Sequence, residues 1–270
     1  MIVLYRWFVF LIYALSAYFY WHDFIKEKKD SNKAQITFII ALVSHLLIII
    51  HFAVNFGRIP IANVSETLDT FVWITSALYL MLELRLKERS HGALILSIML
   101  ILLFIANITY RFTDDINPIL YDIKFEIHVI AMLLGYSGFT LAFIASVLFL
   151  LLSREIHKRE LGLFYRRLPS LVFFERISDY AINVGLLFSG IGFILGYYFA
   201  SLVWSTSIYT DPKIISVLIT WIIYFIHFLG QRSGKIRGQR AAIFSVVGFG
   251  LVLFSFLIIS TLIPGSHQFI

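Results

Sequence analysis

The sequence predicts an all-α integral membrane protein, a bundle of eight transmembrane helices with both chain termini outside. Of its 270 residues, 60% are hydrophobic and only 14% are charged. A soluble domain is about half apolar and about a quarter charged, so this chain is too apolar for a water-soluble surface to enclose. The charged residues are also clustered, and the apolar runs between them approach the ~20 residues that cross a bilayer as a helix. Because backbone groups in lipid must be paired within their own segment, we expect every span to be helical.

Eight apolar runs define the predicted spans. They lie at residues 3–21, 35–56, 67–84, 92–109, 127–152, 180–203, 214–230 and 241–263. We interpret residues 1–270 as a single membrane domain, since there is no soluble domain, long linker or low-complexity tract. Segment 155–178 is amphipathic and interrupted by Pro169, so we expect it to lie in the membrane interface.

The loops after the first, third, fifth and seventh spans assign the orientation. They contain 17 of the 22 lysine and arginine residues. The positive-inside rule places these loops in the cytoplasm, which leaves both termini outside. The same anchoring residues account for the net charge of +6. We therefore expect a multi-pass protein of the cell membrane (plasma or inner membrane). Its surroundings are the lipid bilayer, and we expect no nucleic acid among its partners.

The chain contains no cysteine. This excludes disulfides, thiolate metal sites and a CxxC redox role for this chain. Any thiol chemistry would have to come from a partner protein.

Two histidines are predicted at the outer surface. His128 opens the fifth span and His267 follows the last span. Neutral imidazole is a good iron ligand, and bis-axial ligation needs two imidazoles that face each other. Trp204, in the outer loop between them, offers a flat apolar surface for a porphyrin. The alternative is two ordinary interfacial histidines near the lipid headgroups.

Three histidines lie within predicted spans, where a polar side chain is costly and by default marks a function. His227 is near the cytoplasmic end of the seventh span, and His45 and His51 are in the second. Six residues at about 100° each put the last two on different helix faces, so at most one should face His227, and His45 matches it better in depth. The alternative is a polar link between helices. His22, His91 and His157 adjoin cytoplasmic loops, and we interpret them as solvated or interfacial.

Two outer carboxylates, Glu66 and Asp211, could orient a histidine or bind a basic partner. Each also suits a helix cap. Glu66 has capping-box spacing from Asn63, and Asp211 precedes Pro212 at the start of the seventh span.

Five segments of the sequence, taken in their order along the chain, resemble the cytochrome c assembly superfamily, which includes CcsA, ResC, CcmC and HemX proteins. The similarity runs from about Gly57 to the end of the chain. The segments are GRIPIANVSETLDTFVW, FEIHVIAMLLGYSGFTLAF, LPSLVFFERISDYAINVGLLFSGIGFILGYYFA, TDPKIISVLITWIIYFIHF and GFGLVLFSFLIISTLIPGSHQF.

The resemblance implies a haem-binding membrane protein of cytochrome c biogenesis. It assigns His128 and His267 to axial ligation of haem at the outer face, beside the loop that contains Trp204 and Asp211. It assigns His227 to a deeper haem position, with His45 or His51 as its partner. The haem would be b-type and non-covalent. A CcsB/ResB-like membrane subunit and apocytochrome c are the implied partners, and we expect no catalysis by this chain alone.

The outer loop departs from the family pattern Trp-Gly-x-x-Trp-x-Trp-Asp-Pro-Lys-Glu. Here it reads WSTSIYTDPKI over residues 204–214, so one tryptophan and Asp-Pro-Lys survive. This divergence is closer to the HemX branch, which implies an alternative function: a membrane regulator of glutamyl-tRNA reductase that acts on this cytoplasmic enzyme of haem synthesis through its basic inner loops. A third reading is a structural or transport subunit that binds no haem.

The charge pattern predicts the topology directly. A reporter fused to the C-terminus should be active only outside the cytoplasm, and the loops after the first, third, fifth and seventh spans should be labelled only from inside. A C-terminal reporter that is active only in the cytoplasm would refute the arrangement.

Overall fold

The structure, a computed structural model, describes residues 2–26, 32–112, 117–159, 162–203 and 211–254. These residues form helices and connecting turns, and no strand occurs among them. The all-α class predicted from the sequence is therefore confirmed.

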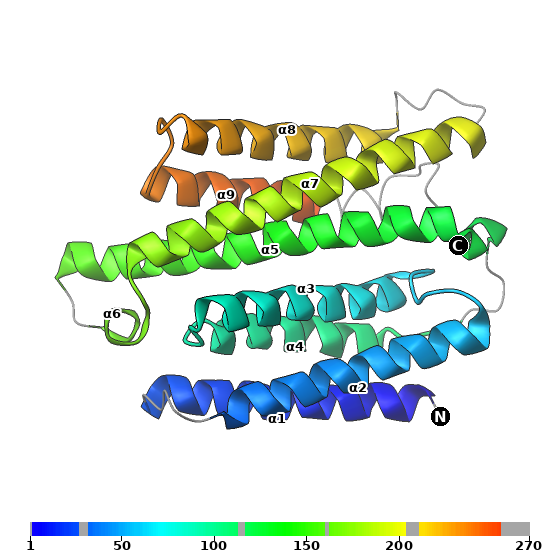
Figure 1. Cartoon of the computed structure of the whole chain (residues 1–270), viewed down its shortest axis with the longest axis horizontal. Helices are drawn as coiled ribbons and strands as arrows, with labels where there is room; N and C mark the ends of the chain where they lie inside the picture. The colour runs from blue at the N-terminus through cyan, green and yellow to red at the C-terminus, as the bar shows by residue number, and fades with distance from the viewer. Residues whose placement is uncertain (1, 27–31, 113–116, 160–161, 204–210, 255–270) are drawn as a thin grey trace. The chain divides into compact units, whose positions relative to one another are not determined.

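Eight long helices each overlap one predicted span (Figure 1). They are α1 (Ile2–Lys26), α2 (Lys33–Phe56), α3 (Val64–Leu86), α4 (Gly92–Ile108), α5 (Ile123–Lys158), α7 (Leu171–Val203), α8 (Pro212–Arg232) and α9 (Gln239–Leu253). Two short elements join them, the 3₁₀ helix η1 (Pro118–Tyr121) and α6 (Leu163–Arg167).

Six of these helices are long and apolar enough to cross a membrane: α1, α2, α3, α5, α7 and α8. Over the described residues, α4 and α9 are apolar but have 17 and 15 residues. The chain is therefore a multi-pass membrane protein by length and composition, while the count of eight spans and the orientation of the termini stay predictions.

The helices of the fifth and sixth predicted spans extend beyond their expected bounds at the connection between them. The expected spans were 127–152 and 180–203, but α5 continues to Lys158 and α7 begins at Leu171. Residues at both ends of segment 155–178 are thus part of these helices, and the interfacial location of the segment stays a prediction. The reason for the extension is packing, because Phe174 and Ile177 are buried before the predicted span begins.

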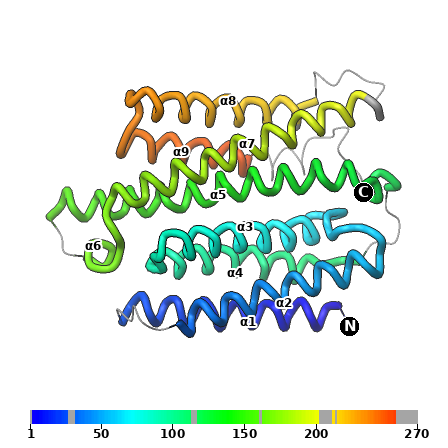
Figure 2. The backbone as a smooth tube through the Cα atoms, in the orientation of Figure 1, coloured from blue at the N-terminus to red at the C-terminus, as the bar shows by residue number. Residues whose placement is uncertain are grey.

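The chain forms two compact units, which are described separately. The first is Met1–Tyr121 with Arg166–Leu168, and the second is Asp122–Tyr165 with Pro169–Ile270. In the first unit α1 packs along α2 and α4, and α3 packs on α4 and α2 (Figure 2). Tyr13, Phe38 and Met99 are fully buried in it.

The second unit is built on the close pairing of α5 with α7, and α9 and α8 complete it. Glycine makes this approach possible: a Cβ at Gly138 would lie 2.6 Å from the backbone nitrogen of Gly185. On the neighbouring pair of helices, Trp221 of α8 donates a hydrogen bond to the carbonyl oxygen of Leu186 on α7 at 3.1 Å.

His91 is buried and not solvated as expected. It precedes α4, and its ring packs edge-on against Tyr79 with 5.4 Å between ring centroids. Burial lowers the pKa of His91 to about 4, although Glu88 nearby opposes the shift. The imidazole is therefore neutral at neutral pH, and it adds no positive charge to this end of the unit.

Candidate functional site

His128 lies in the second turn of α5, where Asp122 caps the helix by accepting a hydrogen bond from the backbone nitrogen of Lys124. Its ring is half-buried, and Nδ1 lies 2.7 Å from the carbonyl oxygen of Gly192 on α7. A carbonyl only accepts, so Nδ1 is the donor nitrogen of this ring. In a neutral imidazole this is the tautomer that binds iron through Nε2.

His227, in the last two turns of α8, has no polar partner among the described residues. Its side chain is 1% exposed, and neither ring nitrogen forms a hydrogen bond. Its nearest described ring neighbour is Phe244 of α9, stacked at 6.0 Å between ring centroids. A buried polar group without a partner costs free energy, which makes this imidazole a candidate ligand for haem iron.

Asp211 caps α8, as its position before Pro212 indicated. Its Oδ1 accepts from the backbone nitrogen of Ile214 at 3.3 Å, and its carbonyl oxygen accepts from Ile215 at 3.1 Å. Trp204 and His267, predicted beside His128, lie outside the described residues. The outer ligand pair therefore stays a prediction.

His45 and His51 occupy different faces of α2, as the helical spacing predicted. His45 is buried, whereas His51 is exposed beside Asn55, whose side chain lies 3.2 Å from its ring nitrogens. Burial thus distinguishes His45 from His51. Because His45 belongs to the first unit and His227 to the second, their pairing stays a prediction.

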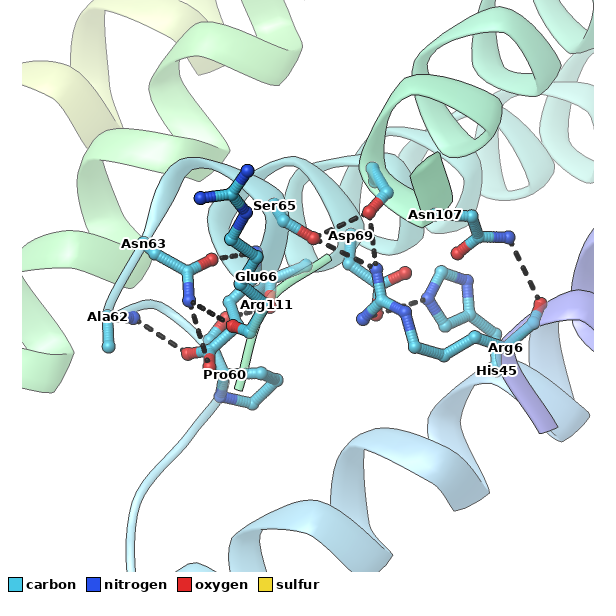
Figure 3. Close-up of polar contacts among 12 residues, drawn as sticks. Arg6, His45, Pro60, Ala62, Asn63, Ser65, Glu66, Asp69, Asn107 and Arg111 are labelled. Carbon is cyan, nitrogen blue, oxygen red and sulfur yellow. Dashed lines mark hydrogen bonds and ion pairs between the residues drawn. The ribbon is translucent and has the colours of Figure 1, made fainter. Parts of the chain in front are cut away.

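His45 is part of a buried polar cluster in the first unit (Figure 3). Its Nε2 lies 3.4 Å from Oδ2 of Asp69 on α3, and its Nδ1 lies 3.4 Å from the hydroxyl of Tyr13 on α1. The same Asp69 oxygen is 3.3 Å from Arg6 of α1. Both ring nitrogens therefore face polar groups, and iron ligation by His45 would require it to leave one of them.

Arg6 also connects α1 to the ends of α3 and α4. Its guanidinium donates to Ser65 at 3.3 Å and to the carbonyl oxygen of Ala106 at 3.1 Å. Its plane lies over the ring of Tyr110, 4.4 Å from the centroid. Arg6 therefore links the first turns of α1 to the first turns of α3 and the end of α4.

Glu66 forms a second buried ion pair one turn before Asp69. Arg58 donates to its two carboxylate oxygens at 2.7 and 3.1 Å. The backbone nitrogen of Ala62 donates to Oε2 at 2.9 Å, and the Asn63 side chain accepts from the backbone nitrogen of Glu66 (Figure 3). The cap at Asn63 is confirmed, and the carboxylate itself fixes the outer loop onto α3.

A third buried carboxylate, Glu83, lies near the other end of α3. The hydroxyls of Tyr20 and Tyr79 each donate to Oε2 at 2.6 Å. Gln35 donates to Oε1 at 2.9 Å, and Arg89 lies 3.6 Å from the same oxygen. This carboxylate thus links α1, α2, α3 and the turn before α4.

Sequence reasoning missed this polar framework. Arg6, Asp69 and Glu83 all lie inside predicted spans, and a charged residue within a span is itself a signal. It does not name a partner, because Arg6 and Asp69 are 63 positions apart. Among the described residues, no group of three or more histidine and acidic side chains is placed to hold a metal ion.

A family model for the cytochrome C assembly protein matches residues 61–267. The chain belongs to the cytochrome c assembly protein family. The family predicted from the order of the sequence motifs is confirmed. No solved structure matches the chain.

This cytochrome c assembly protein is similar to proteins named CcsA and to a protein named HemX. It is 24% identical over 293 residues to the cytochrome c biogenesis protein CcsA of Trieres chinensis, covering 96% of this chain and 93% of the relative. It is 23% identical over 256 residues to protein HemX of Bacillus subtilis, covering 93% and 92%. CcsA of Chlamydomonas reinhardtii is 26% identical over 237 residues, which cover 84% of this chain and 66% of that relative.

The ion pair between Arg6 and Asp69 can be tested by removing one charge. Asp69→Asn leaves the buried guanidinium without its carboxylate, so we expect the variant to lose about 3–5 kcal/mol of stability. Chemical unfolding of the purified protein in detergent measures this loss. The double variant Arg6→Met/Asp69→Leu removes both charges and should be closer to the wild type, because apolar replacement of a buried pair is often neutral. An Asp69→Asn protein as stable as the wild type would contradict the assignment.

Proposed function

We propose that this cytochrome c assembly protein binds haem through histidine side chains and handles it for cytochrome c biogenesis. The observation that supports this most is His227, a buried imidazole whose ring nitrogens have no hydrogen-bond partner among the described residues. Iron ligation would satisfy a nitrogen of this ring, and a neutral imidazole is the usual protein ligand of haem iron.

The residues present fit haem as a cargo. The apolar surroundings of His227, with Phe244 stacked on it, suit a porphyrin. Nδ1 of His128 donates to a backbone carbonyl, and a neutral imidazole in that tautomer binds iron through Nε2. Since the chain has no cysteine, it cannot attach haem through thioether bonds, and we propose a b-type, non-covalent mode.

In this proposal His128 and His267 are the axial ligands at the outer face, with Trp204 as a contact surface and Asp211 as the cap that fixes the start of α8. His227 is the deeper ligand, and His45 is its preferred partner over the exposed His51. Axial ligation by two histidines keeps the iron six-coordinate and limits its reaction with oxygen. The chain supplies binding and orientation, and partner thiols supply the chemistry of attachment.

The proposal includes a single membrane domain of eight spans in the plasma or inner membrane, with both termini outside. Haem held by His128 would then be on the outer side. The similarity to relatives named cytochrome c biogenesis protein CcsA supports an apocytochrome c and a CcsB/ResB-like membrane subunit as partners.

A second candidate function is a HemX-like regulator of glutamyl-tRNA reductase. The similarity to HemX over nine-tenths of both chains supports it, as does the outer loop, which retains one tryptophan. Deletion of the gene distinguishes the two functions. Loss of c-type cytochromes at an unchanged reductase level supports maturation, whereas a changed reductase level with normal cytochromes supports regulation.

His227→Ala should lower the haem content of the purified, folded protein, because it removes the deeper ligand. The Soret absorbance per mole of protein measures this content. His51→Ala is the matched control, since His51 is an exposed histidine in another span, and it should retain wild-type haem. If His227→Ala also retains wild-type haem and activity, His227 is only a packing residue.

If His128 and His267 both bind the same haem iron, the effects of their substitutions on haem binding should not add. His128→Ala and His267→Ala should each weaken haem binding, and the double variant should add little to either one, because both side chains act on one ligand. Added imidazole should partly restore a single variant by occupying the vacated iron position. A wild-type protein that binds no haem in either redox state would end the haem proposal and favour a regulator without haem.

A further inference from the structure

We infer that Gly192 and Gly196 of α7 are positioning residues for the His128 imidazole. Together they form a seat, called here the glycine seat, that sets the plane of the ring and the nitrogen it presents to iron. This inference rests on the proposed role of His128 as a haem ligand. It adds the residues that make this histidine a prepared ligand.

Gly196 leaves the space that the ring occupies. A Cβ built at Gly196 would lie 2.4 Å from Cε1 of His128, 2.8 Å from Nδ1 and 3.1 Å from Nε2. Non-bonded carbon atoms pack at about 3.5–4.0 Å, so no residue with a Cβ fits while the ring keeps this position. The imidazole therefore lies directly against the backbone of α7.

Gly192 supplies the hydrogen bond that fixes the ring. Its carbonyl oxygen accepts from Nδ1 of His128 at 2.7 Å. In an α-helix this carbonyl also accepts from the backbone nitrogen four residues later, which is that of Gly196, and a carbonyl oxygen has two lone pairs for both bonds. Residues four apart share one helix face. The carbonyl oxygen of Gly192 and the space left by the missing Cβ of Gly196 therefore lie one above the other.

The consequence for ligation follows from the chemistry of the imidazole. A ring that donates through Nδ1 to a carbonyl has a fixed tautomer and orientation and a more basic Nε2. Loss of such a partner typically costs about 10–100-fold in metal affinity. The glycine seat would therefore set both the strength of the iron bond and its direction.

The neighbours of Gly196 differ in chemistry from those of other glycines in the α5–α7 pair. Gly135 and Gly138 meet backbone atoms of α7, and Gly185 meets the ring of Phe139. Gly192 itself lies under Met132, whose sulfur would be 2.7 Å from an added Cβ. At Gly196 the three nearest atoms all belong to the imidazole of His128.

The test compares Gly196→Ala with two controls in the full-length protein. An added methyl at Gly250 of α9 meets nothing within 4 Å, so Gly250→Ala should leave haem binding unchanged. Gly138→Ala strains the α5–α7 packing without touching His128, and it should lower stability while the bound haem keeps its six-coordinate spectrum. Gly196→Ala should weaken haem binding about 10–100-fold and shift the spectrum toward five-coordinate, high-spin iron, and added imidazole should reverse the shift.

A second measurement uses protein without haem. In ¹⁵N-histidine-labelled protein, the signals absent from His128→Ala belong to His128, and their shifts report the tautomer. The wild type should show a His128 ring protonated at Nδ1. In Gly196→Ala the shifts should report a different tautomer or an average of the two tautomers. A wild-type His128 protonated at Nε2 would overturn the inference, even if Gly196→Ala fails to fold.

The two proposals fail differently. If His128→Ala loses haem but Gly196→Ala binds it with the wild-type affinity and spectrum, the glycine seat is wrong and the ligand assignment stands. If His128→Ala retains wild-type haem binding, the outer ligand assignment is wrong. If the wild type binds no haem, the proposed function fails, and the tautomer measurement still decides whether the seat exists.

Discussion

Three buried carboxylates on α3 constrain the first unit. Glu66, Asp69 and Glu83 are each at most 3% exposed. An ionised carboxylate removed from water is costly unless it is paired and hydrogen-bonded, so each one determines where a guanidinium must lie. The partners come from three elements: Arg58 from the outer loop, Arg6 from α1 and Arg89 from the turn before α4. The positions of α1, both connections of α3 and the start of α4 follow from this one requirement.

This framework also separates histidines that look equivalent in sequence. His45 lies within the carboxylate cluster, where Asp69 is 3.4 Å from Nε2 and the Tyr13 hydroxyl is 3.4 Å from Nδ1, although Nε2 has no hydrogen bond among the described residues. His227 lies among apolar side chains of the second unit and has no polar neighbour within hydrogen-bonding distance among the described residues. The first environment explains a histidine as a link between helices. The second leaves both ring nitrogens without a hydrogen bond in the described part of the chain, which is why His227 has the deeper ligand role in the proposed function.

In the proposed function, the second unit would hold haem without a covalent bond to it. A chain that lacks cysteine can offer only exchangeable ligands, which suits a group that must later be passed on. An imidazole fixed by a backbone carbonyl is a prepared ligand, because little reorganisation is needed when iron arrives. At His128 the fixing groups are glycines of a neighbouring helix, so the close pairing of α5 with α7 would serve both stability and ligation.

The sequence by itself determined the helical class, the approximate helix positions and the family, and it proposed His128 and His227 as candidate ligands. These follow from local patterns: apolar runs, clustered charges and motifs in a fixed order. Only the tertiary structure decided that α5 and α7 extend beyond their predicted spans, that His45 is buried and His51 exposed, and that Gly192 and Gly196 adjoin His128. The physical reason is distance along the chain. Arg6 and Asp69, or His128 and Gly192, meet across more than 60 residues. No local periodicity specifies such partners, because helix packing alone selects which faces come together.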